Sequence, residues 1–347
     1  MSRLSTLTWT GRALRILDQT QLPRRVRTLN CRDVSSVFWA IRRLSVRGAP
    51  AIGVAAAFGA YLGVMNYPDR RDRSGFIKQL KRVCQTLSRS RPTARNLFWA
   101  LARMEVVPER FLKDDVPLLK ERLLEEANLI LTEEKKTCDR IARFGTSLIR
   151  NGDSVLTHCN AGFLATVGLG TALAVLYQAH EEGKHLRIYA TETRPLFQGS
   201  RLTAWELKRR GLRATVLCDS AAGELFRRGK IRKVITGADR IAANGDTANK
   251  IGTFPLALLA KTYGVPFYIA APASTFDLSL KKGSEIPIEE RPAREVISPL
   301  GVSVAPSRVR VFNPAFDVTP ASLISAFITD RGILRPPYRR SLKQVSF

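Results

Sequence analysis

The stretch Ser154-Val155-Leu156-Thr157-His158-Cys159-Asn160-Ala161-Gly162 decides the fold, because within it an apolar strand gives way to a loop of small and polar residues. A second stretch, Lys233-Val234-Ile235-Thr236-Gly237-Ala238-Asp239, repeats this pattern. In open parallel sheets, ligands bind beyond the carboxyl ends of the strands, and helices that begin there direct backbone N–H groups at anions. A thiol, Cys159, and a carboxylate, Asp239, at two such strand ends predict an enzyme.

Short β-rich runs alternate with longer helical patterns between residues 154 and 272, which predicts repeated βα units on a parallel sheet. The expected strands are Ser154 to His158, Leu186 to Thr191, Ala214 to Asp219, Lys233 to Thr236 and Pro266 to Ala271. The expected helices are Leu164 to Glu182, Leu202 to Arg210, Ala221 to Arg228 and Phe254 to Tyr263, and the glycines expected to end them are Gly183, Gly211, Gly229 and Gly264. This arrangement places four polar residues at one end of the sheet, namely Cys159, Glu192, Asp219 and Asp239.

The first 150 residues lack this alternation and contain helical patterns instead. The expected helices are Val37 to Leu44, Ala51 to Met65, Gly75 to Leu87, Ala94 to Met104 and Val116 to Ser147, after a short extended start at Leu7 to Leu17. The last of these patterns stops at Asn151-Gly152-Asp153, just before the first strand of the sheet. We therefore predict an α/β protein with two domains: a smaller, mainly helical domain in residues 1–150 and a parallel-sheet domain in residues 151–347.

Length and composition are compatible with two domains, since the chain has 347 residues and is 45% hydrophobic. Its five cysteines are odd in number and widely spaced, which argues against a disulfide framework and favours a reducing, cytoplasmic setting. Only three histidines are present, without an HExxH or Cys/His motif, so no metal cofactor is predicted. The apolar stretch Ala51 to Met65 is shorter than the roughly 20 residues of a membrane span and predicts a buried helix.

The formal net charge of +26 is high, and it has two interpretations. Basic clusters at Arg24 to Arg32, Arg70 to Arg95 and Arg339 to Lys343 could bind nucleic acid. The chain nevertheless has no helix-turn-helix signature and no aromatic RNA-binding motif. The sequence therefore favours a solvated basic surface over a nucleic-acid partner.

Four segments have the composition of anion-binding loops, with Arg, Gln, Asn or Lys next to glycine or proline at the start of a helical pattern. They are Arg47-Gly48-Ala49-Pro50-Ala51-Ile52-Gly53, Ser90-Arg91-Pro92-Thr93, Glu192-Thr193-Arg194-Pro195-Leu196-Phe197-Gln198-Gly199 and Asn249-Lys250-Ile251-Gly252. Each segment alone is more typical of an ordinary helix entry. Four of them together predict a phosphorylated small molecule as the ligand.

These motifs, in this order, closely resemble the S-methyl-5-thioribose-1-phosphate isomerase family, the aldose-ketose isomerases of methionine salvage. The resemblance includes Thr157-His158-Cys159-Asn160-Ala161-Gly162, Gly237-Ala238-Asp239-Arg240 and Ala248-Asn249-Lys250-Ile251-Gly252-Thr253. It continues through Ser274-Thr275-Phe276-Asp277, Ile286-Pro287-Ile288-Glu289-Glu290-Arg291 and Phe312-Asn313-Pro314-Ala315-Phe316-Asp317-Val318-Thr319-Pro320. It therefore extends from about Leu14 to Gly332.

The resemblance implies a role for individual residues. Asp239 matches the family's proton donor, and Cys159 matches its second catalytic position. The positions that hold the sugar phosphate are matched by Arg47, Gly48, Ala49, Arg91, Gln198, Asn249 and Lys250. The family fold is a small N-terminal helical domain followed by a Rossmann-like sheet domain, usually as a homodimer and without a metal or nucleotide cofactor. A phosphate held by Arg47 and Lys250 would bridge the two expected domains and favour their closure.

Alternative interpretations come from relatives and from the residues themselves. Ribose-1,5-bisphosphate and 5-deoxyribose-1-phosphate isomerases would share the chemistry, and the regulatory subunits of the translation-initiation guanine-nucleotide exchange factor share the fold without catalysis. Taken singly, Cys159 is also typical of a small buried hydrophobe and Asp239 of a capping residue. Their matched strand-end positions, together with Gln198 and Lys250, favour an enzyme. We interpret His158 and the other four cysteines as structural.

Overall fold

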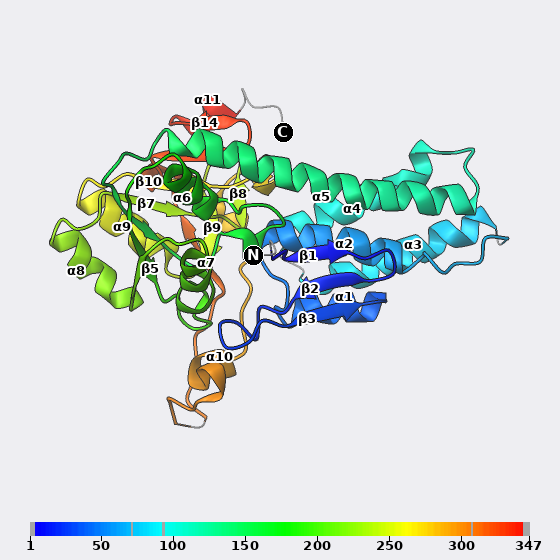
Figure 1. The fold of residues 1–347 in the computed structure, drawn as a ribbon, viewed down its shortest axis with the longest axis horizontal. Helices are drawn as coiled ribbons and strands as arrows, with labels where there is room; N and C mark the ends of the chain where they lie inside the picture. The colour runs from blue at the N-terminus through cyan, green and yellow to red at the C-terminus, as the bar shows by residue number, and fades with distance from the viewer. Residues whose placement is uncertain (1–3, 71, 92–93, 307, 343–347) are drawn as a thin grey trace. The chain divides into compact units, whose positions relative to one another are not determined.

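The structure, a computed structural model, describes residues 4–70, 72–91, 94–306 and 308–342 (Figure 1). The chain packs as two compact units. Unit 1 comprises Met1–Thr137 and Phe163–Gly170, and unit 2 comprises Cys138–Gly162 and Thr171–Phe347. The division falls within helix α5 (Val116–Thr146), whereas the expected domain join near residue 150 follows the end of that helix. The domain boundary near residue 150 therefore stays a prediction.

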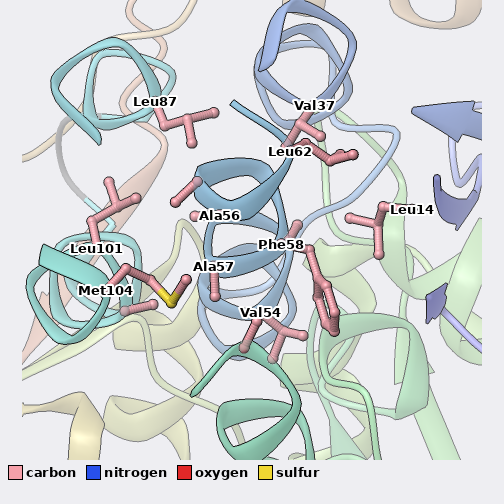
Figure 2. Packing of buried hydrophobic residues seen from close by; sticks show 14 of the residues in the cluster. Leu14, Val37, Val54, Ala56, Ala57, Phe58, Leu62, Leu87, Leu101 and Met104 are labelled. Carbon is pink, nitrogen blue, oxygen red and sulfur yellow. The ribbon is translucent and has the colours of Figure 1, made fainter. Parts of the chain in front are cut away.

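Unit 1 combines a small antiparallel sheet with helices. The sheet has the order β1 (Leu7–Trp9), β2 (Leu14–Leu17), β3 (Thr28–Cys31), and the helices are α1 (Val34–Arg42), α2 (Ala49–Leu62), α3 (Arg73–Ser88), α4 (Arg95–Arg110) and α5 as far as Thr137. Every residue of α2 except Tyr61 is buried, as expected for a helix that is apolar on all sides. Side chains of the neighbouring helices, including Val37, Leu87 and Met104, pack around it (Figure 2). The predicted buried helix is thus the centre of the unit 1 core.

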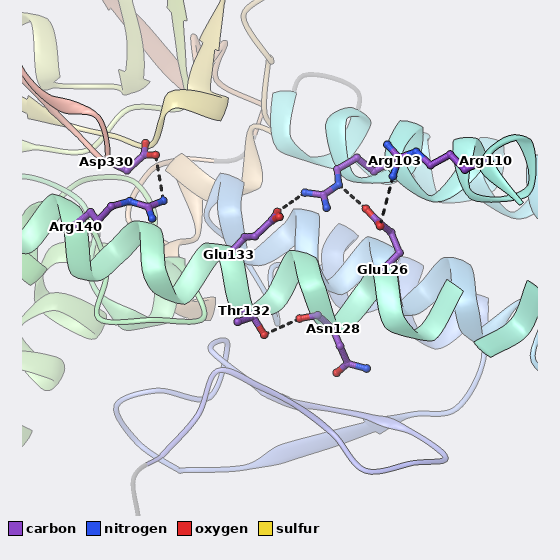
Figure 3. Close-up of polar contacts among 8 residues, drawn as sticks. All are labelled: Arg103, Arg110, Glu126, Asn128, Thr132, Glu133, Arg140 and Asp330. Atoms are coloured by element: carbon purple, nitrogen blue, oxygen red, sulfur yellow. Dashed lines mark hydrogen bonds and ion pairs between the residues drawn. The ribbon is translucent and has the colours of Figure 1, made fainter. Parts of the chain in front are cut away.

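Ion pairs fix α4 against α5 (Figure 3). Arg103 Nε donates to Glu126 Oε1 at 2.6 Å, and another guanidinium nitrogen of Arg103 donates to Glu133. Arg110 lies 3.8 Å from the other oxygen of Glu126. Glu126 is buried, and the two arginines beside its carboxylate offset the cost of removing its charge from water.

Unit 2 is built on a seven-stranded sheet of order β14-β13-β10-β7-β4-β5-β6. All neighbours in it are parallel except β13 and β14, which confirms the predicted parallel sheet. The strands are β4 (Ser154–Thr157), β5 (Arg187–Thr191), β6 (Ala214–Leu217), β7 (Lys233–Thr236), β10 (Phe267–Ala270), β13 (Ala326–Thr329) and β14 (Gly332–Leu334). The helices that connect them are α6 (Ala172–Glu181), α7 (Ala204–Arg209), α8 (Ala222–Arg227) and α9 (Thr253–Thr262).

A second sheet in unit 2, of order β11-β8-β9-β12, was not expected from the sequence. Its strands are β8 (Arg240–Ala242), β9 (Thr247–Lys250), β11 (Phe276–Asp277) and β12 (Phe316–Thr319). The remaining elements of unit 2 are α10 (Arg294–Ile297), α11 (Tyr338–Ser341), a π-helical turn at Gly199–Thr203 and short 3₁₀ turns at Asp219–Ala221, Ala273–Thr275, Gly283–Glu285, Pro299–Gly301 and Ala321–Leu323. This sheet begins immediately after Asp239, so it fixes the chain beyond one of the two candidate residues.

Two helix boundaries differ from the expectation. The helix predicted from Leu164 begins at Ala172, because Gly170 takes a left-handed φ of 105° and the segment Phe163–Gly170 packs with unit 1. Asn249 and Lys250 do not open a helix but end β9, and α9 begins after Gly252, whose φ is 101°. The predicted helix stops are confirmed, since all four glycines have positive φ: Gly183, Gly211, Gly229 and Gly264.

His158, the residue after β4, connects three segments of unit 2. Its side chain is 2% exposed, with Nε2 2.9 Å from the carbonyl oxygen of Ile251 and Nδ1 2.7 Å from Thr191 Oγ1. A carbonyl only accepts, so Nε2 carries the proton and Nδ1 accepts from the hydroxyl of Thr191. Burial lowers the pKa of His158 below its usual 6.5, and the charge of Lys250 acts in the same direction. The histidine is therefore a neutral structural link.

Unfolding should become easier as the pH falls below about 6.5, because His158 binds a proton more readily in the unfolded chain than in the folded protein. The contribution of this one group is at most about 1.4 kcal/mol of unfolding free energy per pH unit. Urea unfolding of wild type, His158→Gln and the exposed control His180→Gln between pH 7.5 and 5.5 measures it. The loss should be smaller in His158→Gln alone; equal losses in all three proteins would contradict a buried neutral imidazole.

Candidate functional site

The loops after β4 and β7 meet at the carboxyl edge of the large sheet. These strands are parallel neighbours, and Cys159 and Asp239 follow their last residues, Thr157 and Thr236. A Cβ atom added at Gly237 would lie 3.0 Å from the Cβ of Ala161, so the two loops touch. Both candidate side chains are half-buried. The structure thus brings the predicted thiol and carboxylate to the same edge, as the sequence indicated.

The backbone of Cys159 is held in a left-handed turn. Its φ is 59°, an uncommon conformation for a residue other than glycine and one that costs about 1–3 kcal/mol. Its N–H donates to Thr193 Oγ1 at 2.8 Å, and its carbonyl accepts from Thr203 Oγ1 at 2.6 Å. Two hydroxyls from the next βα connection therefore stabilise the strained turn that carries the thiol.

The connection after β5 is itself strained and closely packed. Thr193 and Phe197 have positive φ, and a Cβ atom at Gly199 would lie 1.7 Å from the carbonyl oxygen of Thr191. The carboxylate of Asp219 accepts from the backbone N–H groups of Thr193 at 2.8 Å and Arg194 at 2.7 Å. Strained backbone of this kind gathers at functional sites, where the surrounding structure holds it in place.

Gln198, a predicted phosphate-binding residue, lies in this connection and is 4% exposed. Its side-chain oxygen is buried and has no hydrogen-bond partner within the described part of the chain. A buried polar atom left without a partner costs about 1–3 kcal/mol. The amide of Gln198 is therefore suited to a hydrogen bond with a ligand.

Glu192 lies at the same edge, directly after β5. Burial raises the pKa of its carboxyl, and the negative charge of Asp219 raises it further. A carboxyl in such surroundings holds its proton more strongly than usual. The sequence placed Glu192 at this edge without assigning it a role.

The pairing of β8 with β9 in the small sheet brings Asp239, which precedes β8, beside the end of β9, where Asn249 and Lys250 lie. Asp239 N–H donates to the carbonyl of Ala248 at 2.9 Å, and the following residue, Arg240, pairs with Ala248 in the sheet. Asn249 donates to Thr253 Oγ1 at 2.9 Å, which ties the end of β9 to the first residue of α9. The Lys250 ammonium lies 4.7 Å from the centre of a Phe316 ring, a cation–π distance.

Asp317 is a residue of this edge that the sequence did not single out. Its carboxylate accepts from Gly252 N–H at 2.7 Å, at the start of α9. Burial raises the pKa of Asp317 to about 6, although the N–H groups of Gly252, Thr253 and Phe254 act in the opposite direction. The signal in the sequence was its place in a family-like segment, Phe312 to Pro320, in which no residue chemistry could be assigned without the fold.

The other predicted binding residues lie in unit 1. Arg47 is 8% exposed, Gly48 is the N-cap of α2 and Ala49 is the first residue of that helix. Gly48 has a φ of 88°, and a Cβ atom there would lie 2.3 Å from the carbonyl oxygen of Ala165, so only glycine fits. Arg91 is half-buried and follows α3, while Pro92 and Thr93 of the same predicted segment lie outside the described residues.

The described residues are 4–70, 72–91, 94–306 and 308–342. Within them, no group of three or more His, Cys, Asp or Glu side chains is arranged to hold a metal ion. No helix in the same ranges has the length and hydropathy of a membrane span. All five cysteines are thiols.

Comparisons with known proteins agree with the geometry. The model of the initiation factor 2 subunit family matches residues 45–336. The methylthioribose-1-phosphate isomerase of Thermotoga neapolitana is 52% identical over 344 residues, 99% of this chain and 98% of that protein. A crystal structure titled 5-methylthioribose 1-phosphate isomerase, from Pyrococcus horikoshii OT3, is 40% identical with a TM-score of 0.91 and covers 99% of this chain and 96% of its own.

A third protein has a different name but a similar fold. The crystal structure of translation initiation factor eIF-2B, subunit delta, from A. fulgidus is 40% identical, with a TM-score of 0.86 over 98% of each chain. The match to the family model and the identity to the isomerases both extend over most of the chain. The chain therefore belongs to the initiation factor 2 subunit family and, within it, to the methylthioribose-1-phosphate isomerases.

Proposed function

We propose that this chain is an aldose-ketose isomerase that interconverts S-methyl-5-thio-α-D-ribose 1-phosphate and S-methyl-5-thio-D-ribulose 1-phosphate in methionine salvage. The observation that carries the proposal is the 52% identity, along nearly the full length, to a protein named methylthioribose-1-phosphate isomerase. The adjacent loops of Cys159 and Asp239 support it, because the reaction needs groups that move protons at one ligand site.

The chemistry of the substrate accounts for the residue types. Its phosphate occupies the anomeric oxygen, so the ring cannot open by loss of an anomeric hydroxyl proton as in a free aldose. Protonation of the ring oxygen breaks its bond to C1. A hydrogen then moves from C2 to C1, and the C2 hydroxyl becomes a carbonyl as it releases its proton. One proton enters and one leaves, so the isomerisation consumes no oxidant or reductant.

We assign the proton to the ring oxygen to Asp239 and a role beside the C1–C2 transfer to Cys159. Both side chains are half-buried at the carboxyl edge of the large sheet, the place where ligands bind in open parallel sheets. The rigidly held turn at Cys159 supports the second assignment, since a reacting group must be kept in place.

We assign the sugar phosphate to Arg47, Gly48, Ala49 and Arg91 of unit 1 and to Gln198, Asn249 and Lys250 of unit 2. The buried oxygen of Gln198 lacks a hydrogen-bond partner among the described residues and can accept from a sugar hydroxyl. The positive charges supply charge-assisted hydrogen bonds to the phosphate.

The competing function is that of a non-catalytic regulatory subunit, and the similarity to the protein titled eIF-2B subunit delta favours it. The decisive experiment is to incubate the purified protein with methylthioribose 1-phosphate, 5-deoxyribose 1-phosphate and ribose 1,5-bisphosphate and to follow ketose formation by NMR. Turnover of methylthioribose 1-phosphate supports the proposal. Turnover of only one of the other two sugars would change the substrate, and no turnover with any of them would favour the regulatory function.

The same family relationship suggests a homodimer in the cytoplasm, with the charge of +26 on a solvated surface and without a nucleic-acid partner. Light scattering should give twice the mass of one chain. A mass of one chain at micromolar concentration would exclude the dimer.

A fluorescent duplex DNA or RNA should bind to the protein only weakly and lose its binding as salt rises, since nonspecific charge contacts are sensitive to salt.

Replacement of Asp239 by Asn should abolish most turnover while the fold and substrate binding persist, because the amide keeps the shape but cannot deliver the proton. The expected loss in kcat is about 10² to 10⁴ fold. The matched control is Asp153→Asn, which alters a buried ion pair with Lys233 at the opposite end of the sheet and should affect Tm rather than kcat. Near-normal turnover by Asp239→Asn would remove this residue from the mechanism.

Lys250→Ala and Arg91→Ala should each weaken substrate binding by about 1.5 to 3 kcal/mol, the scale of a lost charge-assisted hydrogen bond. The controls Lys261→Ala and Arg89→Ala remove exposed charges of the same kind from nearby positions. These controls test whether the general attraction of the sugar phosphate to a basic protein accounts for the loss of affinity. Calorimetric titration with methylthioribose 1-phosphate measures all four; equal affinities of site and control variants would show that the phosphate binds elsewhere.

A further inference from the structure

A second group of polar side chains lies behind the turn of Cys159, within unit 2. It consists of Asn160, Tyr177, Thr203 and Glu206, which we call the Glu206 cluster. Their exposed fractions are 5%, 1%, 0% and 0%. The proposed chemistry uses none of the four, and a carboxyl with no exposed surface cannot touch a ligand. Their place in the core therefore needs another explanation.

The contacts of the cluster run continuously from Tyr177 to the backbone of Cys159. Tyr177 donates its hydroxyl to one oxygen of Glu206 at 3.0 Å, and Asn160 Nδ2 donates to the other at 2.8 Å. Asn160 Nδ2 also lies 3.2 Å from Thr203 Oγ1, which donates to the carbonyl of Cys159 at 2.6 Å. Glu206 on α7, which also accepts from Tyr177 on α6, thus holds Asn160, the residue after Cys159. Thr203, in the π-helical turn before α7, holds the carbonyl of Cys159 itself.

The local sequence makes room for this carboxyl. A Cβ atom at Gly162 would lie 2.0 Å from Glu206 Oε2, so a side chain there would displace the glutamate. Burial raises the pKa of Tyr177 well above its usual range, and the charge of Glu206 raises it further, so the phenol remains a hydrogen-bond donor at every physiological pH. A buried carboxyl is costly, and apolar side chains of similar volume are often as stable or more so. Stability alone therefore does not explain the cluster.

We propose that Glu206 is a positioning residue for the isomerisation: through Asn160 and Thr203 it holds Cys159 in its left-handed turn. The link to turnover rests on the proposed function. None of the residues of the Glu206 cluster contacts the substrate in this proposal. What it requires is that the turn relaxes when the hydrogen bonds are removed, since φ of 59° is unfavourable for cysteine without them.

The sharpest variants are a pair at Thr203. Thr203→Val keeps the shape and removes the hydroxyl that donates to Cys159, whereas Thr203→Ser keeps the hydroxyl. We expect Thr203→Val to lower kcat about tenfold with KM changed by less than about twofold, and Thr203→Ser to restore most of the rate. Tyr177→Phe, which removes one donor to Glu206, should lower kcat in the same way. Glu206→Gln should retain more activity than Glu206→Ala, because it still accepts from Asn160.

A second measurement does not depend on turnover. Iodoacetamide labelling, read by peptide mass, gives the alkylation rate of Cys159, and the exposed thiol of Cys218 in the same protein is the internal reference. In Thr203→Val and Tyr177→Phe, the relaxed turn should expose the half-buried thiol of Cys159 and raise its rate roughly threefold or more, with Cys218 unchanged. The buried thiol of Cys138 reports unfolding, so faster alkylation at Cys159 with Cys138 still protected is not expected from loss of stability alone.

The matched control is Tyr338→Phe, which removes another buried phenol of unit 2, hydrogen-bonded to the carbonyl of Ile324 at 2.8 Å. It should lower Tm without changing kcat or the rate at Cys159. The proposal is overturned if folded Thr203→Val and Tyr177→Phe keep the wild-type kcat and the wild-type alkylation rate at Cys159. If the wild type isomerises none of the sugar phosphates, the proposed function fails, while the alkylation rates still test the positioning.

Discussion

The conformation of one residue, Cys159, constrains the carboxyl edge of the large sheet. A cysteine with φ of 59° needs partners for both its N–H and its carbonyl, and Thr193 and Thr203 provide them. Beyond these, Thr193 lies 3.3 Å from the hydroxyl of Thr191, which donates to His158, and His158 donates to Ile251. One chain of hydrogen bonds thus joins the thiol turn to the start of α9, next to Lys250.

This constraint accounts for polar groups in places where a core would otherwise be apolar. Buried hydroxyls and the neutral His158 form hydrogen bonds within two residues of a strand end. The buried carboxyl of Glu206 does so in a helix behind the sheet. Such groups stabilise only when they are fully hydrogen-bonded, and they specify one arrangement of the loops. The cost in stability is consistent with a site that must hold a thiol and a carboxyl at fixed positions.

Much of the large sheet could be predicted from the sequence, because β4, β5, β6, β7 and β10 are short β-rich runs separated by helices that end at glycine. The same argument placed Cys159, Glu192, Asp219 and Asp239 at one edge of the sheet. The contact of Gly237 with Ala161 confirms that the loops of Asp239 and Cys159 meet there. The small sheet was missed, because its strands have two to four residues and contain polar residues such as Asn249 and Lys250. The predicted strands of the large sheet are also short, with four or five residues, but they are mostly apolar and alternate with helices.

The supporting residues could not be predicted for a different reason. Thr203, Glu206 and Tyr177 look like ordinary helix residues in the sequence, and their relation to Cys159 arises only when α6 and α7 pack on the sheet. Asp317 similarly meets Gly252 through pairing of β12 with β9. Long-range contacts of this kind leave no local pattern, whereas motifs at strand ends do.

Amide hydrogen exchange at Cys159 tests the central claim, that its turn is rigidly held, most directly. The N–H of Cys159 donates to the buried hydroxyl of Thr193, so it should exchange as slowly as the amides of the adjoining strand β4. Thr203→Val should increase its rate toward that of exposed loop amides that make no hydrogen bond. Exchange of the wild-type Cys159 amide at the rate of an exposed loop would contradict the account.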